Sequence, residues 1–265
     1  MKIFRIDPTF QSWRGAARMA ISNELPPGDC IFVERGEASL FEADTFAEEK
    51  TAKEIRVPKE FKPLAEAVAC HVDTAKWQLL YMLLWRLNHG EPKLLEISSD
   101  PVVRRAHELQ KQVGRSIHKM TAFVRFREFQ REGDEKSHFF AWYEPEHFIL
   151  NRVAPFFRDR FYSMNWSILT PIGCIHWNLK DLSWSEPVSK PLNLEPDSKE
   201  ELWLAYYRST FNPARLKLKA MTAEMPKKYW KNLPEAGTIS ELIQNALPRV
   251  ERMLNRAAVE GVDKM

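Results

Sequence analysis

The sequence is poor in glycine and cysteine, with 9 glycines and 3 cysteines among 265 residues. It contains neither the GxGxxG pattern nor a P-loop pattern, which argues against a glycine-rich phosphate site. Cys30, Cys70 and Cys174 are far apart and odd in number, so we expect free thiols in a reducing compartment, without a cysteine-based zinc site. HExxH and GxSxG patterns are also missing, and we expect no cofactor.

Long apolar runs are missing as well. No stretch approaches the roughly 20 residues that a membrane span needs, and the start "MKIFRIDPTFQSW" lacks the apolar segment of a secretory signal. We therefore expect a cytoplasmic protein. The chain is 44% hydrophobic and 28% charged, and its 9 tryptophans and 16 phenylalanines are sufficient for a substantial core.

The first half of the chain reads as strand, helix, strand and then three helices. "KIFRI" and "CIFVE" are typical of strands, and Thr9 is a suitable N-cap for the helix between them. Residues 35–54 are polar and acidic and indicate a connector. The three predicted helices cover about 59–70, a segment from Asp73 to near Gly90, and about 101–119.

The second half changes to a period of two, which is typical of strands. "AFVRFREFQ" and "SHFFAWYEP" predict one hairpin around "REGDEK", "WSILTP" and "CIHWN" predict another, and "LSWSE" an edge strand. A helix over about 146–161, interrupted by Pro155, separates the hairpins. Further helices are predicted from Ser198 and over 239–256. The sequence thus predicts an α+β fold, in which a small antiparallel sheet packs against a set of helices.

Positive charge is concentrated in two windows. Residues 104–127 contain seven lysines and arginines and one glutamate, a net charge of +6, and residues 211–236 carry +4. Since the whole chain is only +3, the remainder sums to −7. Such windows suit the phosphates of DNA, with aromatic side chains stacking on bases. The candidate contacts are Arg104, Lys111, Arg115, Lys119, Arg215, Lys217, Lys219, Lys227, Lys228, Tyr229 and Trp230. The alternative is a solvated helix face with the aromatics in the core.

Several blocks in fixed order resemble a family of uncharacterised bacterial proteins assigned to DNA metabolism or repair. They include "VPKEFKPLAEAVACH", "LLWRLNHGEP", "HKMTAFVRFRE" and "FFAWYEPEHFILNRVAPFFRDRF". The resemblance implies a radical-SAM DNA modification or repair protein as partner, and members of the family also occur fused in front of uracil-DNA-glycosylase-like domains. This chain lacks the CxxxCxxC pattern of the radical enzyme itself. By this resemblance we expect an N-terminal α/β subregion over 1–57, a core domain over 58–236 and a C-terminal helix over 237–265.

A second candidate site is "WYEPEH". Glu144, Glu146 and His147 suit acid–base catalysis or a divalent metal, although no spacing supplies further ligands and no metal site is assigned. A helix start at Pro145 and Glu146 explains the same residues. Lys119 is a further candidate, as a Schiff-base lysine, but nothing distinguishes it from a phosphate contact. Cys70 is expected to be a buried cysteine.

We therefore expect a DNA-binding accessory protein that acts with a radical-SAM partner in DNA repair or modification. One alternative is a nuclease or lyase centred on Glu144, Glu146 and His147. The other is a protein–protein scaffold that makes no contact with DNA.

Overall fold

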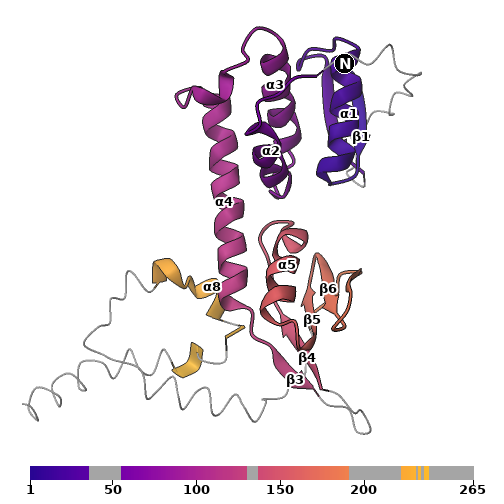
Figure 1. The fold of residues 1–265 in the computed structure, drawn as a ribbon. Helices are drawn as coiled ribbons and strands as arrows, with labels where there is room; N and C mark the ends of the chain where they lie inside the picture. The colour runs from indigo at the N-terminus through magenta and orange to yellow at the C-terminus, as the bar shows by residue number, and fades with distance from the viewer. Residues whose placement is uncertain (36–54, 130–136, 191–221, 231, 234–235, 239–265) are drawn as a thin grey trace, which may run out of the picture. The chain divides into compact units, whose positions relative to one another are not determined.

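The computed structural model describes residues 1–35, 55–129, 137–190, 222–230, 232–233 and 236–238 (Figure 1). The chain folds into two compact units. Unit 1 comprises Met1–Thr121 and Pro145–Phe156, and unit 2 comprises Ala122–Glu144 and Phe157–Met265. Each unit is therefore built from two separate stretches of the sequence.

Unit 1 begins with a small βαβ element. β1 (Lys2–Ile6) and β2 (Cys30–Glu34) pair in parallel, and α1 (Phe10–Ser22) connects them, because parallel neighbours need a crossover connection. The Thr9 hydroxyl accepts a hydrogen bond from the Ser12 N–H at 3.2 Å. The predicted strand, helix and strand, with Thr9 as the N-cap, are confirmed.

Three further helices follow in the first stretch of unit 1, as the sequence predicts. They are α2 (Phe61–Ala69), α3 (Lys76–Asn88) and α4 (Pro101–Phe123), with the short 3-10 helix η1 (Leu94–Glu96) between the last two. α3 is buried on nearly every side: Trp77 stacks on Trp13 with ring centroids 6.4 Å apart, and Tyr81 is fully buried. Gly90, at φ +97°, follows the end of α3 in a backbone conformation that favours glycine.

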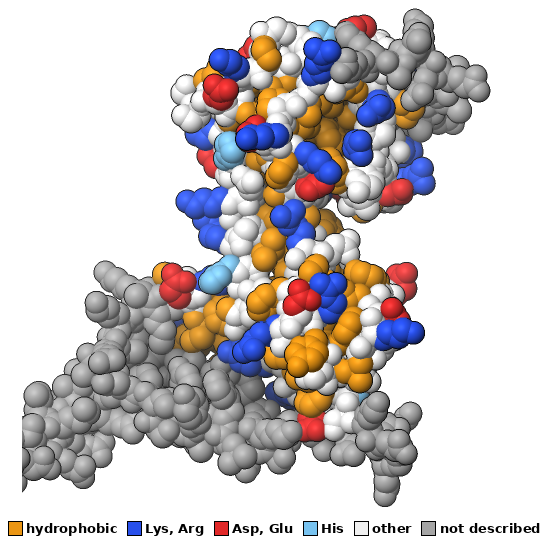
Figure 2. All heavy atoms as spheres, viewed as in Figure 1, with side chains coloured by type: hydrophobic (Ala, Val, Ile, Leu, Met, Phe, Trp, Pro, Cys, Tyr) orange, Lys and Arg blue, Asp and Glu red, His pale blue; other side chains and the backbone are white. Residues whose placement is uncertain are grey.

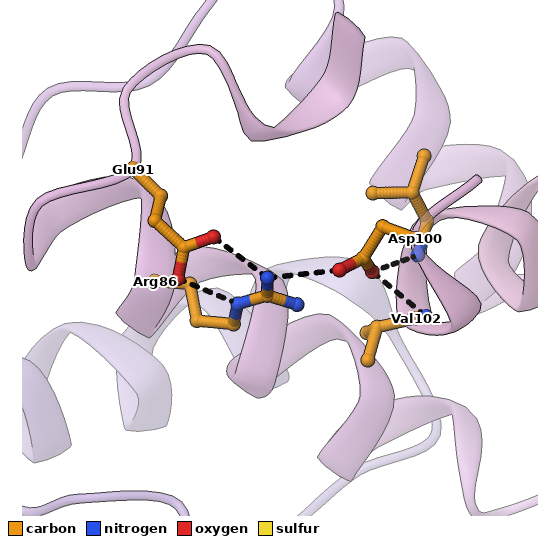
Figure 3. Close-up of polar contacts among 5 residues, drawn as sticks. Arg86, Glu91, Asp100 and Val102 are labelled. Atoms are coloured by element: carbon orange, nitrogen blue, oxygen red, sulfur yellow. Dashed lines mark hydrogen bonds and ion pairs between the residues drawn. The ribbon is translucent and has the colours of Figure 1, made fainter. Parts of the chain in front are cut away.

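A polar network fixes the start of α4 (Figure 3). Asp100 Oδ1 accepts hydrogen bonds from the N–H groups of Val102 and Val103 at 2.9 and 3.1 Å, so Asp100 is the cap of α4. Arg86 Nη2 donates to Asp100 Oδ2 at 2.8 Å and to Glu91 Oε2 at 2.6 Å. The Arg86 guanidinium holds the pKa of the Asp100 carboxyl below its ordinary value. The loop between α3 and α4 is thus tied to both helices.

Unit 2 contains a five-stranded sheet in the order β3-β4-β5-β6-β7. The strands are β3 (Arg127–Phe129), β4 (His138–Trp142), β5 (Asn165–Thr170), β6 (Gly173–Trp177) and β7 (Leu182–Ser185). Both predicted pairs of antiparallel strands and the edge strand are present, and the α+β class is confirmed. β3 is shorter than its predicted strand over 122–130, because α4 continues to Phe123. The expected purely antiparallel arrangement is wrong, because β4 and β5 pair in parallel. The helix between the hairpins returns the chain in the same direction, which makes the sheet mixed.

That helix, α5 (Leu150–Arg160), differs from its prediction in two respects. It begins at Leu150 instead of near residue 146, and it continues through Pro155 without interruption. Pro155 lies on the exposed side, where water can hydrogen-bond the carbonyl that the proline leaves without a donor. From its C-terminal turn, Phe157 packs against Trp166 of β5 at 6.2 Å between ring centroids, in the core of unit 2.

Several predictions fall on residues outside the described ranges. These are the connector over 36–54, the turn at 131–136, the helix from Ser198 and the helix over 239–256. Among the described residues, no helix is both long enough and apolar enough to cross a membrane.

Candidate nucleic-acid interface

Helix α4 is amphipathic, as its sequence predicts. Its buried residues are apolar except for one serine, and they are Val103, Ala106, Leu109, Val113, Ser116 and Met120. Arg104, Lys111 and Arg115 are exposed. At 3.6 residues per turn, these three side chains fall within about 40° of one another on the helix and span about 16 Å along it.

The cations of α4 differ in their partners. Arg105 pairs with Asp73 at 3.2 Å and with Glu108 at 3.6 Å. In the described ranges, no carboxylate pairs with Arg104, Lys111 or Arg115. Lys119 is half-buried and has a partner within the chain. The stripe that remains open to an external anion therefore consists of Arg104, Lys111 and Arg115, and we call it the α4 stripe.

The second basic window is described only in part. Arg215, Lys217, Lys219 and Lys231 lie outside the described residues, whereas α8 (Lys227–Trp230) begins directly after Pro226. Lys227 and Lys228 are exposed on this short helix.

The aromatic residues of α8 hold it in place within unit 2. Tyr229 is buried and stacks on Phe123 and on Tyr143, with ring centroids 5.4 and 5.8 Å apart. Trp230 is half-buried, and its Nε1–H donates to the Met225 carbonyl at 3.0 Å. Of these two rings, only that of Tyr229 belongs to the core. Their contact with a base stays a prediction, for which Trp230 is the more open of the two.

The acidic candidates do not form a helix start. Glu144 belongs to unit 2, whereas Glu146 and His147 belong to unit 1 and precede α5 in a bend. The expectation that Glu146 lies in the first turn of α5 is wrong. His147 is buried, with its ring 4.2 Å from that of His71. Over the described ranges, no group of three or more His, Cys, Asp and Glu side chains is placed to hold a metal ion. Catalysis by these three residues stays a prediction.

A buried polar cluster that sequence reasoning missed surrounds the start of α3. The Lys76 side chain is fully buried, and its Nζ donates to the His71 carbonyl at 2.6 Å and pairs with Glu34 at 3.2 Å. Trp77 Nε1–H also donates to Glu34, at 2.7 Å. Burial lowers the pKa of Lys76, while the Glu34 carboxylate opposes this effect. Because no external ligand reaches a fully buried ammonium group, the cluster joins β2 to α3 as part of the core. The sequence signal that could have revealed this cluster was Lys76, a charged residue beside the apolar residues of α3.

Cys70 and His71 occupy the turn before this cluster. Burial raises the pKa of the Cys70 thiol, which is half-buried and donates to the Glu66 carbonyl at 3.4 Å. His71 Nε2 lies 2.8 Å from Gln112 Oε1, and its Nδ1 accepts from the Asp73 N–H at 3.0 Å. These partners assign the ring proton to Nε2, so His71 is a structural link between the turn and α4.

Two further histidines meet across the sheet of unit 2. Ser167 Oγ lies 2.8 Å from His138 Nε2 and 2.7 Å from His176 Nδ1, and His176 Nε2 lies 2.9 Å from Ser185 Oγ. Burial lowers the pKa of both imidazoles. We call these four residues the His–Ser ladder. Sequence spacing did not connect the two histidines, because only the pairing of β4, β5 and β6 brings them to the same serine.

Comparison with known proteins assigns the chain to a family but identifies no individual relative. No curated protein and no solved structure matches the chain. The model of the DUF4130 family, described as a domain of unknown function, matches residues 74–235, which include α3, α4, α5, the sheet of unit 2 and α8. The chain therefore belongs to the DUF4130 family of domains of unknown function.

Proposed function

We propose that this protein binds DNA through the α4 stripe and acts as an accessory to a DNA repair or modification enzyme. The observation that supports the proposal is the set of three exposed cations, Arg104, Lys111 and Arg115, without carboxylate partners in the described ranges. Glu108 lies on the same side of α4, about 40° from Arg104 and about 20° from Arg115, but its carboxylate pairs with Arg105 at 3.6 Å. Three cations face this one carboxylate, which Arg105 already contacts, so this side of α4 has a net positive charge.

The geometry of the stripe fits a polyanion better than a small anion. A single phosphate contacts only neighbouring side chains, whereas a row of cations about 16 Å long needs negative charge repeated over a similar distance. Each strand of DNA supplies a phosphate about every 3.4 Å along the helix axis. Lys227 and Lys228, exposed on α8, add positive charge in unit 2. Because contacts to phosphates carry no sequence information, we expect binding through phosphates to be independent of DNA sequence.

The accessory role and the radical-SAM partner are supported by the family resemblance described above. If the partner docks through apolar surface, its binding changes little with salt, whereas binding of phosphates weakens steeply as salt rises.

The test is a titration of the protein with short single-stranded and double-stranded DNA at several salt concentrations, followed by fluorescence anisotropy. We expect binding at low salt, and a logarithm of affinity that falls linearly with the logarithm of salt concentration. No binding to either DNA at low salt contradicts the proposal and leaves the scaffold alternative.

A further inference from the structure

Unit 1 contains a pocket of about 200 Å³ between α1, α2 and α3. Its apolar wall includes Phe10, Trp13, Val57, Phe61 and Leu84. Trp13 and Phe61 are almost fully buried and form the floor, whereas Val57 is 39% exposed and opens the wall to solvent. In Figure 2, hydrophobic side chains over this part of unit 1 gather in a hollow that Lys and Arg side chains border. The volume is below the range of about 300 to 1,000 Å³ of drug-sized sites and suits a single ring system.

The polar lining of the pocket carries only positive charge. Arg14, Arg18 and Lys62 line it, and all three are exposed. Lys62 pairs with Glu66 at 3.8 Å. In the described part of the chain, Arg14 and Arg18 have no ion-pair partner, and neither α1 nor the pocket lining contains an aspartate or glutamate.

Without a bound anion, the positive charges of Arg14 and Arg18 destabilise α1. They are four residues apart on α1, where like charges repel across one helical turn. A bound anion removes this repulsion and can accept hydrogen bonds from both guanidinium groups. The pocket thus combines an apolar slot for a flat ring with a cationic rim for a negatively charged group.

We propose that this pocket binds a nucleotide, with the base against the apolar wall and the phosphate between Arg14 and Arg18. Two kinds of ligand offer a base and a phosphate together, namely a nucleotide within single-stranded DNA and a free nucleotide. The inference rests on the proposed DNA-binding function only where the nucleotide belongs to DNA. A free nucleotide tests the pocket independently of the α4 stripe.

The first experiment compares a ten-nucleotide oligothymidylate with an abasic oligonucleotide of the same length and charge. Both offer phosphates to the α4 stripe, but only the first offers bases. Stacking of one base gives a preference of roughly 5- to 150-fold for oligothymidylate. The variant Val57→Trp fills the open wall without a change in charge, and we expect it to lose the preference while it still binds both oligonucleotides.

The second experiment titrates thymidine 5′-monophosphate into the wild type and into Arg14→Ala/Arg18→Ala by isothermal calorimetry. Loss of the charge-assisted hydrogen bonds weakens binding roughly 10- to 100-fold. The control is Lys93→Ala/Lys180→Ala, which removes the same charge from exposed positions outside the pocket lining and is expected to bind like the wild type.

The outcomes separate the two proposals. If the wild type binds both oligonucleotides equally and does not bind thymidine 5′-monophosphate, the pocket inference is overturned while the α4 stripe stands. If the wild type binds neither oligonucleotide, the DNA-binding proposal fails. In that case, the pocket is still supported as a site for free nucleotides if the wild type binds thymidine 5′-monophosphate and Arg14→Ala/Arg18→Ala does not. If the wild type does not bind thymidine 5′-monophosphate either, the pocket inference is also overturned.

Discussion

Arg86 Nη2 lies 2.8 Å from Asp100 Oδ2, and the other carboxylate oxygen of Asp100 caps α4 (Figure 3). One aspartate therefore determines both where α4 begins and how its first turn is joined to α3. Since α4 carries the candidate interface, this contact is the structural basis for the direction in which the α4 stripe points.

Replacing Asp100 by alanine tests this relationship. The variant loses the cap of α4 and one of the two carboxylates that contact Arg86, and loss of a capping side chain alone costs about 0.5 to 2 kcal/mol. We expect the free energy of unfolding in urea to fall by at least that amount. Asp100→Asn keeps a capping oxygen and is expected to lose less. Equal losses for the two variants contradict a role for the cap.

Tyr229 provides a test of how α8 is held. Its buried ring stacks on Phe123 and Tyr143, so Tyr229→Ala leaves a cavity in unit 2. We expect a loss of about 3 to 5 kcal/mol, as for other large aromatic residues, measured by chemical denaturation. Tyr229→Phe preserves the stacking and is the matched control. A loss near zero for Tyr229→Ala contradicts the anchoring role.

The Lys76–Glu34 pair predicts non-additive substitutions. Lys76→Met leaves the Glu34 carboxylate without its ammonium partner, and breaking a buried pair in this way costs about 3 to 5 kcal/mol. Lys76→Met/Glu34→Gln removes both charges, so we expect the double variant to be more stable than Lys76→Met alone. A double-mutant cycle from urea denaturation measures this coupling. Additive effects show that the two side chains do not interact.

The His–Ser ladder predicts a dependence of stability on pH. Burial lowers the pKa of His138 and His176 in the folded state, so below about pH 6.5 the unfolded chain binds more protons than the folded protein. The free energy of unfolding is therefore expected to fall as the pH falls below about 6.5. Well above that pH, the two histidines are neutral in both the folded and the unfolded state, and they no longer change the stability. In His138→Asn/His176→Asn, the slope of stability against pH between about 5 and 7 becomes shallower. An unchanged slope contradicts the assignment of this pH dependence to His138 and His176.

The sequence predicts local structure well where one pattern dominates. On α4, residues that repeat at helical spacing separate into a buried apolar side with Ala106, Leu109, Val113 and Met120 and an exposed basic side with Arg104, Lys111 and Arg115. Thr9 and Asp100 are caps whose identity is local to their helices. Pro155 was misleading, because its exposed position in α5, which lets the helix continue, depends on the fold of the chain around it.

Features that depend on distant residues were not predictable in the same way. The parallel pairing of β4 with β5 joins two hairpins whose turns are each visible in the sequence, but their order in the sheet depends on how α5 packs. Glu34 and Lys76 are 42 positions apart and meet only after β2 and α3 pack together. The His–Ser ladder likewise requires the registers of four strands. In each case the pattern is local, whereas the site is formed by tertiary contacts.

DNA binding through α4 is tested by a comparison of Lys111→Ala/Arg115→Ala with the charge-matched control Lys93→Ala/Lys180→Ala. All four side chains are exposed, so we expect both double variants to unfold at the temperature of the wild type. The measurement is the slope of the logarithm of affinity for duplex DNA against the logarithm of salt concentration. Each lost phosphate contact lowers the steepness of that slope by about 0.9, so the account predicts a change of up to about 1.8 for the α4 variant and little change for the control. Equal slopes for the wild type and Lys111→Ala/Arg115→Ala would contradict DNA binding through α4.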